Sequence, residues 1–450
     1  MNRLTELLPG KTSTEPEDLI CYGFDASGLD SAPSAVAWPQ DVSDVSKLMS
    51  FAYKNSIAVF PRGAGSGMTG GSVPSQGSIV LSLEKMNRVL EIDKENLFVL
   101  VEPGVINGKL QRELERHKLF FPPDPTSMNF CTIGGNVAEN AGGPRAFKYG
   151  VTRDYVMGLE AVLPDGRIIN TGVKTAKGVV GYDLTSLLTG SEGTLAVITK
   201  IRLKVIPLSE EIITLLVLFK ETGLAGEAVR SIVAEGIIPM TLEFLDSEAV
   251  NAVENYKPVG LPEGAAEMLL IEMDGQPQAI QSDAEKVSDI CTRLNGNIIM
   301  AENELARARL WEARRAVSPA LYHLNPSKIN EDIVVPRNKI SEMLKYLKRM
   351  SEETGIKIVN FGHAGDGNIH VNLMVDSNKK EEFEQAQKLV KKIFSKTLEL
   401  GGTISGEHGI GLTKLNYISM EIPPDELALM KKIKNAFDPK NILNPGKILP

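Results

Sequence analysis

Cysteine is scarce in this sequence of 450 residues, which contains only Cys21, Cys131 and Cys291. An odd number of widely separated cysteines argues against a disulfide framework. It also argues against an iron–sulfur cluster, which needs four closely grouped thiolates. The chain is therefore expected to fold around an ordinary hydrophobic core and to carry no electron-transfer cluster of its own.

Long hydrophobic runs and basic blocks are also absent. The longest strongly apolar run, residues 212–219, is interrupted by Thr214 and is far shorter than the roughly 20 residues of a membrane helix. A net charge of -8 with no basic block argues against a nucleic-acid partner. The N-terminus lacks a signal pattern, and Glu6, Glu15 and Glu17 argue against a transit peptide. These absences predict a cytoplasmic protein, or one that reaches a membrane only through a partner.

Glycine, in contrast, is abundant, and five glycines fall within residues 61–71. A short apolar run at 57–60 precedes them and is expected to form a buried strand. Dense glycine allows positive φ angles and close approach of a ligand, and successive N–H groups form an anion-binding nest. Arg62 can add a charge-assisted hydrogen bond. We expect this segment to cradle a pyrophosphate, with a glycine-rich turn that binds nothing as the alternative.

Residues 65–70 also match the dinucleotide fingerprint G-x-G-x-x-G. A Rossmann fingerprint must open a helix, whereas residues 71–77 read GSVPSQG and cannot be helical. Residues 79–83 then resemble another strand. We therefore interpret the region as a strand–loop–strand cradle and not as a Rossmann unit.

The rest of the first 207 residues alternates short strands and helices. A helix capped by Asp41 or Ser43 is expected before the cradle. Further strands are expected at 97–102 and 196–206, a helix at 109–117, and a hairpin from 155–163 and 167–171. A second glycine-dense segment, 132–143, indicates backbone held close to a flat or phosphorylated ligand, with a surface Ω-loop as the alternative. A domain boundary is expected near residue 208.

The second half of the chain has a different pattern of elements. Strands are expected at 212–219, 240–245, 268–273 and 297–300, and helices at 224–234, 279–294, 305–324, 340–354, 381–400 and 425–437. This alternation predicts an α+β layer with an antiparallel sheet and helices on one face.

Three of the five histidines lie in two glycine-rich segments. Residues 358–373 are predicted to form a hairpin with a turn at 364–367, so that His363 lies opposite Asn368. Because side chains alternate along a strand, His370 shares the face of Asn368 and the two imidazoles meet. Ile369, Val371 and Leu373 point to the opposite face and are expected to pack into the core behind the histidines. Two convergent imidazoles have the geometry of metal ligands.

Glu407 offers a third ligand from the other glycine-rich segment, 405–411. A site of two histidines and one carboxylate suits Zn, Mn or Fe(II) and leaves positions open for substrate. His408 is adjacent and can act as the base, and either Arg314 or Arg315 can clamp a carboxylate. The alternative is that these are ordinary core or surface side chains.

Taken together, these motifs resemble the vanillyl-alcohol oxidase / p-cresol methylhydroxylase flavoprotein superfamily, and within it the branch of D-lactate dehydrogenase and the glycolate oxidase D-subunit. The matching segments cover nearly the whole chain: 61–71, 122–140, 148–154, 190–194, 361–370, 406–411 and 437–445. The resemblance implies an α+β protein with a two-subdomain FAD-binding domain of the p-cresol methylhydroxylase type over 1–207. It further implies an α+β cap domain with an antiparallel sheet over 208–418, carrying the substrate and metal, and a tail at 419–450 that returns to the FAD domain.

The resemblance also implies FAD as the cofactor, held without a covalent bond, because no attachment histidine is evident at the cradle. The residues expected to hold FAD are Pro61, Arg62, Gly63, Ala64, Gly65, Ser66, Gly67, Pro123, Asp124, Gly134, Gly135, Asn136, Asn140, Gly142, Gly143, Gly150, Asp154, Glu192, Gly193, Ile198 and Asn444.

Metal-dependent members such as D-2-hydroxyglutarate dehydrogenase imply the remaining roles. His363, His370 and Glu407 would bind a divalent metal, Zn, Mn or Fe, while His408 would be the base and Arg314 would hold the substrate carboxylate. The hydroxyglutarate enzyme has a lysine at the position of Asn330, and this departure favours a small monocarboxylate such as lactate or glycolate.

The resulting hypothesis is oxidation of a small 2-hydroxy acid, such as lactate or glycolate, to the 2-oxo acid. The metal acidifies the hydroxyl, His408 takes the proton, and the α-hydride passes to flavin N5. Without a cluster of its own, the chain needs an external acceptor: an electron-transfer flavoprotein, an iron–sulfur subunit or a quinone. Two alternatives are a non-catalytic flavin-carrying subunit and an oxidase that reduces oxygen directly.

Overall fold

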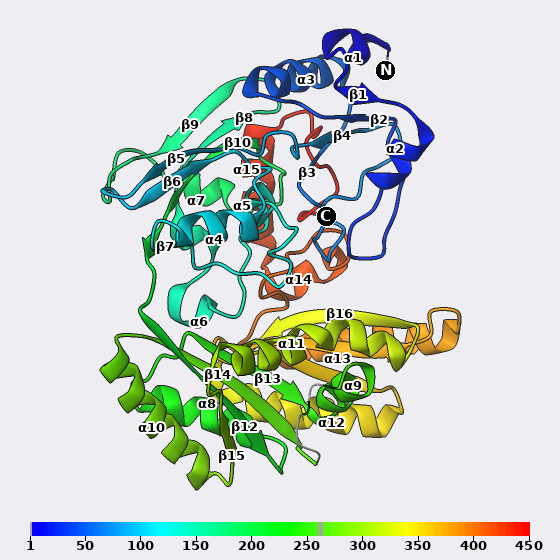
Figure 1. The fold of residues 1–450 in the computed structure, drawn as a ribbon. Coiled ribbons are helices and arrows are strands. Elements are labelled where there is room, and N and C mark those ends of the chain that lie inside the picture. The colour runs from blue at the N-terminus through cyan, green and yellow to red at the C-terminus, as the bar shows by residue number, and fades with distance from the viewer. Residues whose placement is uncertain (1, 259, 261–263) are drawn as a thin grey trace. The chain divides into compact units, whose positions relative to one another are not determined.

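The computed structural model describes residues 2–258, 260 and 264–450 (Figure 1). The chain divides into two compact units. The first comprises Met1–Gly142, Gly150–Leu208 and Glu407–Pro450, and the second comprises Gly143–Tyr149 and Ser209–Gly406. Within the described residues, no helix has both the length and the apolar character needed to span a bilayer.

The first unit begins with a four-stranded sheet in the order β1-β2-β4-β3. Its strands are β1 (Thr12–Ser13), β2 (Ala35–Ala37), β4 (Ile79–Ser82) and β3 (Val59–Arg62). Helices α1 (Asn2–Leu7) and α3 (Val42–Asn55) pack on it, and α2 (Pro16–Cys21) lies between β1 and β2 in the chain. Asp41 caps α3 by accepting from the N–H of Asp44 at 3.0 Å, as the sequence predicted.

The cradle region has the predicted strand–loop–strand form. Strand β3 ends at Arg62 and β4 begins at Ile79, with no helix between them among these described residues. The two strands are direct parallel neighbours, with Val59 opposite Ile79. A Rossmann unit would have a helix in this connection, and that interpretation is excluded.

A five-stranded antiparallel sheet, in the order β5-β6-β10-β8-β9, completes the first unit. Its strands are β5 (Val89–Asp93), β6 (Phe98–Val101), β10 (Val197–Lys204), β8 (Val156–Val162) and β9 (Ile168–Gly172). The β8–β9 hairpin and helix α4 (Asn107–Glu115) were predicted, whereas β5 was not. Strand β5 is an edge strand whose first three residues are exposed, so it lacks a buried apolar face to reveal it.

The second glycine-dense segment contains a helix that the sequence did not predict. Helix α5 (Ile133–Glu139) is capped by Thr132, whose hydroxyl accepts from the N–H of Gly135 at 3.2 Å, and ends at Asn140 with φ +54°. The Ω-loop alternative is therefore wrong. Thr132 as N-cap and Asn140 as a left-handed C-terminal residue are features that indicate a helix. They were outweighed in the prediction by the adjacent Gly134 and Gly135, because glycine disfavours a helix. Short elements follow at α6 (Ala146–Tyr149) and α7 (Leu184–Leu188), and β7 (Leu119–Phe120) pairs with β11 (Ile206–Pro207).

The second unit contains a seven-stranded antiparallel sheet in the order β15-β12-β14-β13-β17-β18-β16. The strands are β15 (Asn297–Met300), β12 (Glu211–Phe219), β14 (Glu267–Gly275), β13 (Thr241–Asp246), β17 (Ile358–His363), β18 (Asn368–Val375) and β16 (Ser327–Val334). The antiparallel sheet was predicted, but β16 and helix α9 (Ser247–Tyr256) were not.

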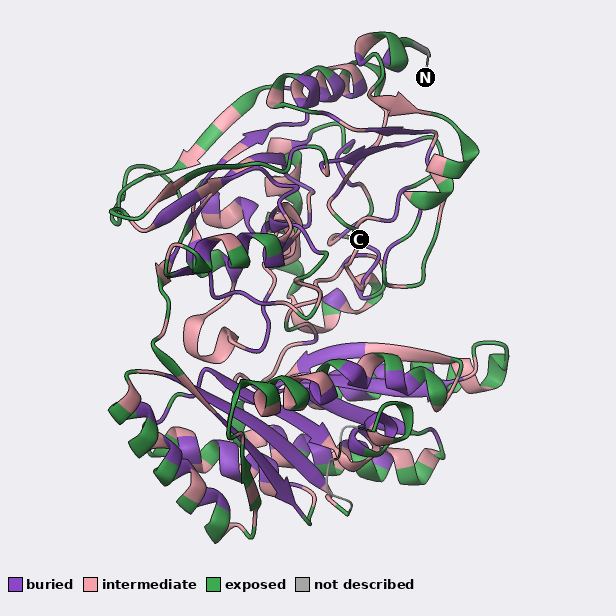
Figure 2. Cartoon of the chain, viewed as in Figure 1, coloured by how far each residue is buried: buried purple, intermediate pink, exposed green. Residues whose placement is uncertain are grey.

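Helices cover both faces of this sheet, so the prediction of helices on one face is wrong. Helices α9 and α11 (Glu304–Ala320) share a core with Leu216 and Leu218 of β12. The alternate residues Leu215 and Val217 point to the opposite face and are also fully buried. The remaining helices of this unit contact the sheet as well: α8 (Leu224–Ala234), α10 (Pro277–Arg293), α12 (Ile340–Thr354) and α13 (Lys380–Glu399). Figure 2 shows the central strands buried along most of their length.

The C-terminal segment joins the core of the first unit after α14 (Ile418–Glu421) and α15 (Pro424–Phe437). Leu443 forms a parallel bridge with Val59 of β3, and the N–H of Asn444 donates to the carbonyl of Val59 at 2.8 Å. The Asp438 carboxylate accepts from the N–H groups of Ile442 and Leu443, which fixes the turn into this bridge.

Candidate functional site

The β17–β18 hairpin brings His363 and His370 together in the predicted register. His363 lies opposite Asn368 and His370 opposite Phe361, so both imidazoles project from one face. Their ring centroids are 5.2 Å apart, and the two residues are 3% and 6% exposed. The turn requires glycine at Gly367, where φ is +86° and a Cβ would overlap the carbonyl oxygen of Val335.

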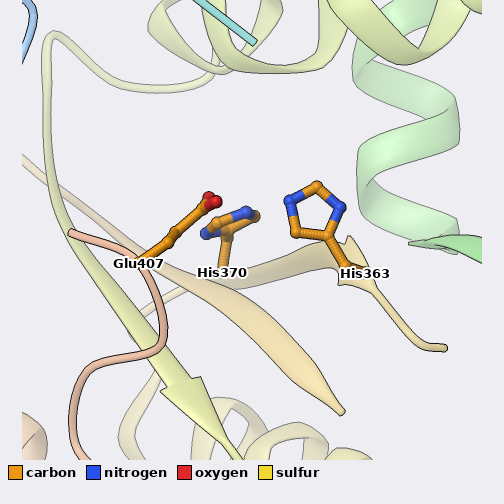
Figure 3. A group of neighbouring side chains, drawn as sticks. All are labelled: His363, His370 and Glu407. Atoms are coloured by element: carbon orange, nitrogen blue, oxygen red, sulfur yellow. The ribbon is translucent and has the colours of Figure 1, made fainter. Parts of the chain in front are cut away.

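Glu407 completes a candidate metal site with these two histidines (Figure 3). One ligand atom from each of the three side chains lies within 4.8 Å of the others. The preceding residue, Gly406, donates its N–H to the Asp332 carboxylate at 2.9 Å, and Asp332 lies opposite His370 in the sheet. Two imidazole nitrogens and a carboxylate oxygen are a donor set that fits Zn, Mn or Fe(II).

Glu243 joins the site, although sequence reasoning missed it. Its carboxylate is fully buried and lies 2.5 Å from His363 Nδ1 and 2.5 Å from Arg314 Nε. Burial raises the pKa of Glu243, but the hydrogen bonds from His363 and Arg314 and the positive charge of Arg314 bring that pKa below its ordinary value. Since the carboxylate can only accept, His363 carries its proton on Nδ1 and presents the lone pair of Nε2. The available signal was a single glutamate inside the apolar run 240–245.

Arg314 is the buried member of the arginine pair, while Arg315 is exposed. Its Nε donates to Glu243, and its guanidinium carbon lies 5.0 Å from the ring centroid of Phe361. This places the guanidinium beside the His363 strand. An arginine side chain has five N–H groups, and only the one on Nε donates to Glu243.

Polar side chains of β16 continue along the same face of the sheet. Asn330 donates its amide to Asn372 Oδ1 at 2.8 Å, while its own carbonyl oxygen has no hydrogen-bond partner within the described chain. Lys328 donates to Ser318 Oγ at 2.9 Å, and burial lowers the pKa of this lysine to about 8. The face that carries the histidines therefore also carries the polar side chains of Lys328, Asn330 and Asn372.

The glycine-rich cradle has the features of an anion nest. Across the part of the chain that the structure describes, none of the backbone N–H groups of residues 63–68 donates a hydrogen bond. Gly65 and Gly70 have φ angles of +68° and +80°. Arg62 braces the loop, because it donates to the carbonyl of Phe24 at 2.5 Å and to Ser72 Oγ at 3.3 Å. Unused N–H groups in a positive-φ loop fit a pyrophosphate.

The N-terminal end of α5 packs directly against this cradle. A Cβ at Gly63 would overlap Thr132 Oγ1, and one at Gly134 would meet Pro103. Asn136 is 3% exposed, and neither its amide nitrogen nor its amide oxygen has a partner among the described residues. A buried amide without partners fits a site completed by a ligand.

Other expected FAD residues are dispersed around the cradle. Asn444 donates to the carbonyls of Gly71 and Glu192, and a Cβ at Gly193 would lie 3.6 Å from Pro61. The carbonyl of Pro123 accepts from the Asn107 side chain, and the Asn140 side chain accepts from the N–H of Arg153. The Asp154 carboxylate accepts from the N–H of Val151, next to Gly150. Asp124 is buried, and Ile198 lies in β10. A Cβ at Gly142 would lie 3.3 Å from Glu407 Oε2. Gly143 is the first residue of the segment that is grouped with the second unit.

His408 lies beside Glu407, with 3.9 Å between His408 Nε2 and Glu407 Oε1. Its carbonyl accepts from Thr69 Oγ1 at 3.0 Å. Glu192 accepts from the N–H groups of Ile410 and Gly411, both at 2.8 Å. Burial raises the pKa of Glu192, and these two N–H groups oppose that rise. Local sequence patterns do not reveal that Thr69 and Glu192 hold this segment, because the contacts join residues more than 200 positions apart.

Comparison with known proteins shows the family of this chain. The family described as FAD linked oxidases, C-terminal domain, matches residues 208–448, and the FAD binding domain family matches residues 33–172. The chain is 44% identical over 431 residues to glycolate oxidase subunit GlcD of Bacillus subtilis, covering 95% of this chain and 92% of the relative. It is 39% identical to D-lactate dehydrogenase of Archaeoglobus fulgidus, in an alignment that covers 100% of this chain and 98% of the relative.

Solved structures confirm the expected fold class. A crystal structure of p-cresol methylhydroxylase with substrate bound superposes with a TM-score of 0.80 at 18% identity, covering 99% of this chain and 95% of that chain. The mixed helix and sheet architecture with antiparallel sheets is thus the p-cresol methylhydroxylase type of flavoprotein fold.

Proposed function

This chain belongs to the family of FAD-linked oxidases, and on that premise we propose that it oxidises a small 2-hydroxy acid, such as D-lactate or glycolate, to the 2-oxo acid. The relatives named as a glycolate oxidase subunit and as D-lactate dehydrogenase support an FAD-dependent hydroxy acid dehydrogenase. The observation that carries the finer proposal is the His363–His370–Glu407 cluster, with Glu243 fixing the orientation of His363.

FAD would be bound without a covalent bond by the cradle and the α5 segment. The unused N–H groups of residues 63–68 would receive the pyrophosphate, and the unpaired amide of Asn136 would meet another polar group of the cofactor. In this proposal residues 1–207 form the FAD-binding part, 208–418 the substrate and metal part, and 419–450 the tail that completes the FAD-binding part.

In the proposed reaction, the protein positions the substrate and moves one proton. His363, His370 and Glu407 would hold a divalent metal, which would supply Lewis acidity at the substrate hydroxyl, and bound FAD would supply the two-electron acceptor. His408 accepts the hydroxyl proton, and Arg314 binds the substrate carboxylate through N–H groups that Glu243 does not use. Glu243 keeps the His363 proton on Nδ1 throughout.

An external acceptor would then reoxidise the flavin. The relative from Bacillus subtilis is named as a subunit, which supports transfer to a partner protein, either an electron-transfer flavoprotein or an iron–sulfur subunit, or through it to a quinone.

Anaerobic flavin bleaching with a panel of D- and L-2-hydroxy acids tests this function. We expect D-lactate or glycolate to bleach the flavin faster than D-2-hydroxyglutarate, since Asn330 replaces the lysine of the hydroxyglutarate enzyme. Absence of bleaching with every acid would favour a flavin-carrying subunit without catalysis. Rapid reoxidation by oxygen, with stoichiometric peroxide, would favour an oxidase.

A further inference from the structure

Within the first unit, the segment that carries the proposed base is held by contacts with Glu192 and Thr69. This segment, residues 407–413, has no regular secondary structure and contains Gly409 and Gly411. Glu192 holds its middle, and Thr69 holds the residues on either side. A segment without regular secondary structure is positioned by its contacts with the surrounding chain, and the contacts with Glu192 and Thr69 contribute to this.

Glu192 makes the central contact. Each of its two carboxylate oxygens accepts one backbone N–H, from Ile410 and from Gly411, at 2.8 Å. The residue is 6% exposed and has φ +48°, an uncommon left-handed conformation for a residue with a side chain. Such conformations persist where the surroundings require them. Here the conformation aims the carboxylate at the two N–H groups that directly follow Gly409.

Thr69 makes the second contact, from the end of the cradle. Its hydroxyl donates to the carbonyl of His408 at 3.0 Å, and its carbonyl accepts from the N–H groups of Leu412 and Thr413 at 2.7 and 3.1 Å. The cradle is itself held at this end, because Lys447 donates to the carbonyl of Gly70 at 2.6 Å. Thr69 therefore joins the loop proposed to bind FAD to the segment proposed to move the proton.

Both glycines of the segment allow this close approach. Gly409 has φ +80°, and a Cβ there would lie 2.8 Å from Glu192 Oε1 and 2.8 Å from Glu139 Oε2. Gly411 has φ +49°, and a Cβ there would overlap the carbonyl oxygen of Thr69. A side chain at position 409 would therefore displace Glu192, and a side chain at position 411 would displace Thr69.

From these contacts we propose that Glu192 and Thr69 are positioning residues, which fix His408 by anchoring residues 407–413 to the end of the FAD cradle. The role of the segment rests on the proposed function, whereas the anchoring contacts do not. Glu192 then acts through the backbone of Ile410 and Gly411 and is not a direct ligand of FAD. The same cradle loop would bind the cofactor and hold the base.

Hydrogen exchange in the full-length holoprotein tests the anchoring independently of activity. Glu192→Gln keeps the shape of the side chain but replaces one accepting oxygen with an amide that cannot accept. We expect the Ile410 and Gly411 amides to exchange at least about 10-fold faster, because they lose a charge-assisted partner. Thr69→Val should speed exchange in the same segment, and Thr69→Ser, which keeps the hydroxyl, should restore the parent rate.

Two variants in the same unit serve as matched controls. Glu160→Gln alters a carboxylate that pairs with Lys200, and Thr199→Val removes a buried hydroxyl that donates to Glu160. Neither side chain contacts residues 407–413 in any described interaction. Both controls should leave exchange at 407–413 unchanged. Equal acceleration in the controls would mean general loosening and would overturn the anchoring role.

Flavin content and the rate of anaerobic flavin reduction separate positioning from cofactor binding. Glu192→Gln should retain its FAD and reduce it roughly 10- to 100-fold more slowly, the usual effect of a misplaced catalytic group. Loss of FAD with unchanged exchange at 407–413 would show that Glu192 binds the cofactor and would overturn the proposal. Faster exchange with a parental reduction rate would overturn it as well. If none of the 2-hydroxy acids reduces the flavin of the parent protein, the proposed function fails. The exchange result still decides whether Glu192 and Thr69 anchor the segment.

Discussion

Glu243 holds two functional side chains at once, and it does so from a position where a charge is costly. A carboxylate with no exposure loses its hydration, and this loss is offset only by close opposite charge and complete hydrogen bonding. Arg314 supplies the charge and His363 the second hydrogen bond. The orientation of the candidate metal ligand His363 thus depends on Glu243, which is not itself one of the three candidate ligands.

Glu243→Gln should weaken metal binding about 10- to 100-fold, the usual cost of losing a residue that orients a ligand. It should also lower the free energy of unfolding by about 3–5 kcal/mol, because Arg314 is left buried without its counter-charge. Chelator competition and urea unfolding measure the two effects. The matched control is Glu272→Gln, which removes a buried carboxylate bound to Arg307 and should destabilise the protein without changing metal affinity.

His408→Asn should keep FAD and metal but slow anaerobic flavin reduction by roughly 10²–10⁴-fold, the usual contribution of a positioned base. The hydroxyl proton must leave as the hydride departs, and asparagine cannot accept it. His363→Ala should differ by losing metal together with activity. Stopped-flow flavin reduction and metal analysis on both variants check this prediction, and a parental rate in His408→Asn would place the base elsewhere.

At the scale of the element, the β17–β18 hairpin was predictable and its surroundings were not. Strand alternation and the glycine-containing turn placed His363 opposite Asn368 without further information. Helix α5 was concealed by its own glycines, and β16 by a mixture of polar and apolar residues that shows no clean alternation. The second layer of helices was missed because the nearly unbroken apolar run of β12 indicates burial on both faces, a signal that was not used.

Gly367→Ala should destabilise the hairpin and lower metal occupancy, because the φ of +86° disfavours alanine and its Cβ would overlap the Val335 carbonyl. Gly355→Ala is the matched control, since φ is +73° but no atom lies within 4 Å of the hypothetical Cβ. The control should cost about 1–2 kcal/mol, the penalty of the left-handed conformation alone. Urea unfolding should show a larger loss for Gly367→Ala, and equal losses would contradict the steric argument.

The start of helix α9 should make stability depend on pH. Asp246 caps α9 through the N–H of Ala249 and also accepts from Asn360, and burial raises its pKa to about 7. Because the folded pKa exceeds the unfolded value, the contribution of Asp246 is fully present below about pH 4 and is lost as the pH rises through 7. Urea unfolding should therefore show Asp246→Asn gaining stability relative to the parent between pH 5 and pH 8, by at most about 4 kcal/mol. A constant difference between the two proteins across this range would contradict the shifted pKa.

At the scale of the whole molecule, the first unit is built from three separate stretches of chain. Local sequence patterns predicted most individual elements, but they contain no information about pairing between residues such as Val59 and Leu443. The same limit applies to Glu192 and Gly411, and to Thr69 and His408. Only the family resemblance indicated that the C-terminal tail returns to the beginning of the chain.

Removal of residues 438–450 should therefore abolish FAD binding, because it deletes the bridge to β3 and the Asn444 and Lys447 contacts that hold the cradle carbonyls. The ratio of flavin to protein absorbance measures this loss. Asn444→Ala is the milder comparison, since it removes only the bonds to Gly71 and Glu192 and should lower FAD content in part. Full FAD content in the truncated protein would refute a role for the tail in shaping the cradle.

The three-stretch construction of the first unit also constrains how the protein is made on the ribosome. Leu443 and Asn444 are synthesised more than 380 residues after Val59, so β3 lacks this neighbouring segment until both residues have been made. The long insertion Ser209–Gly406 is synthesised in the meantime and can fold before the stretches on either side of it unite. A nascent chain that ends before Leu443 would thus contain an incomplete first unit, without the segment that bridges to β3.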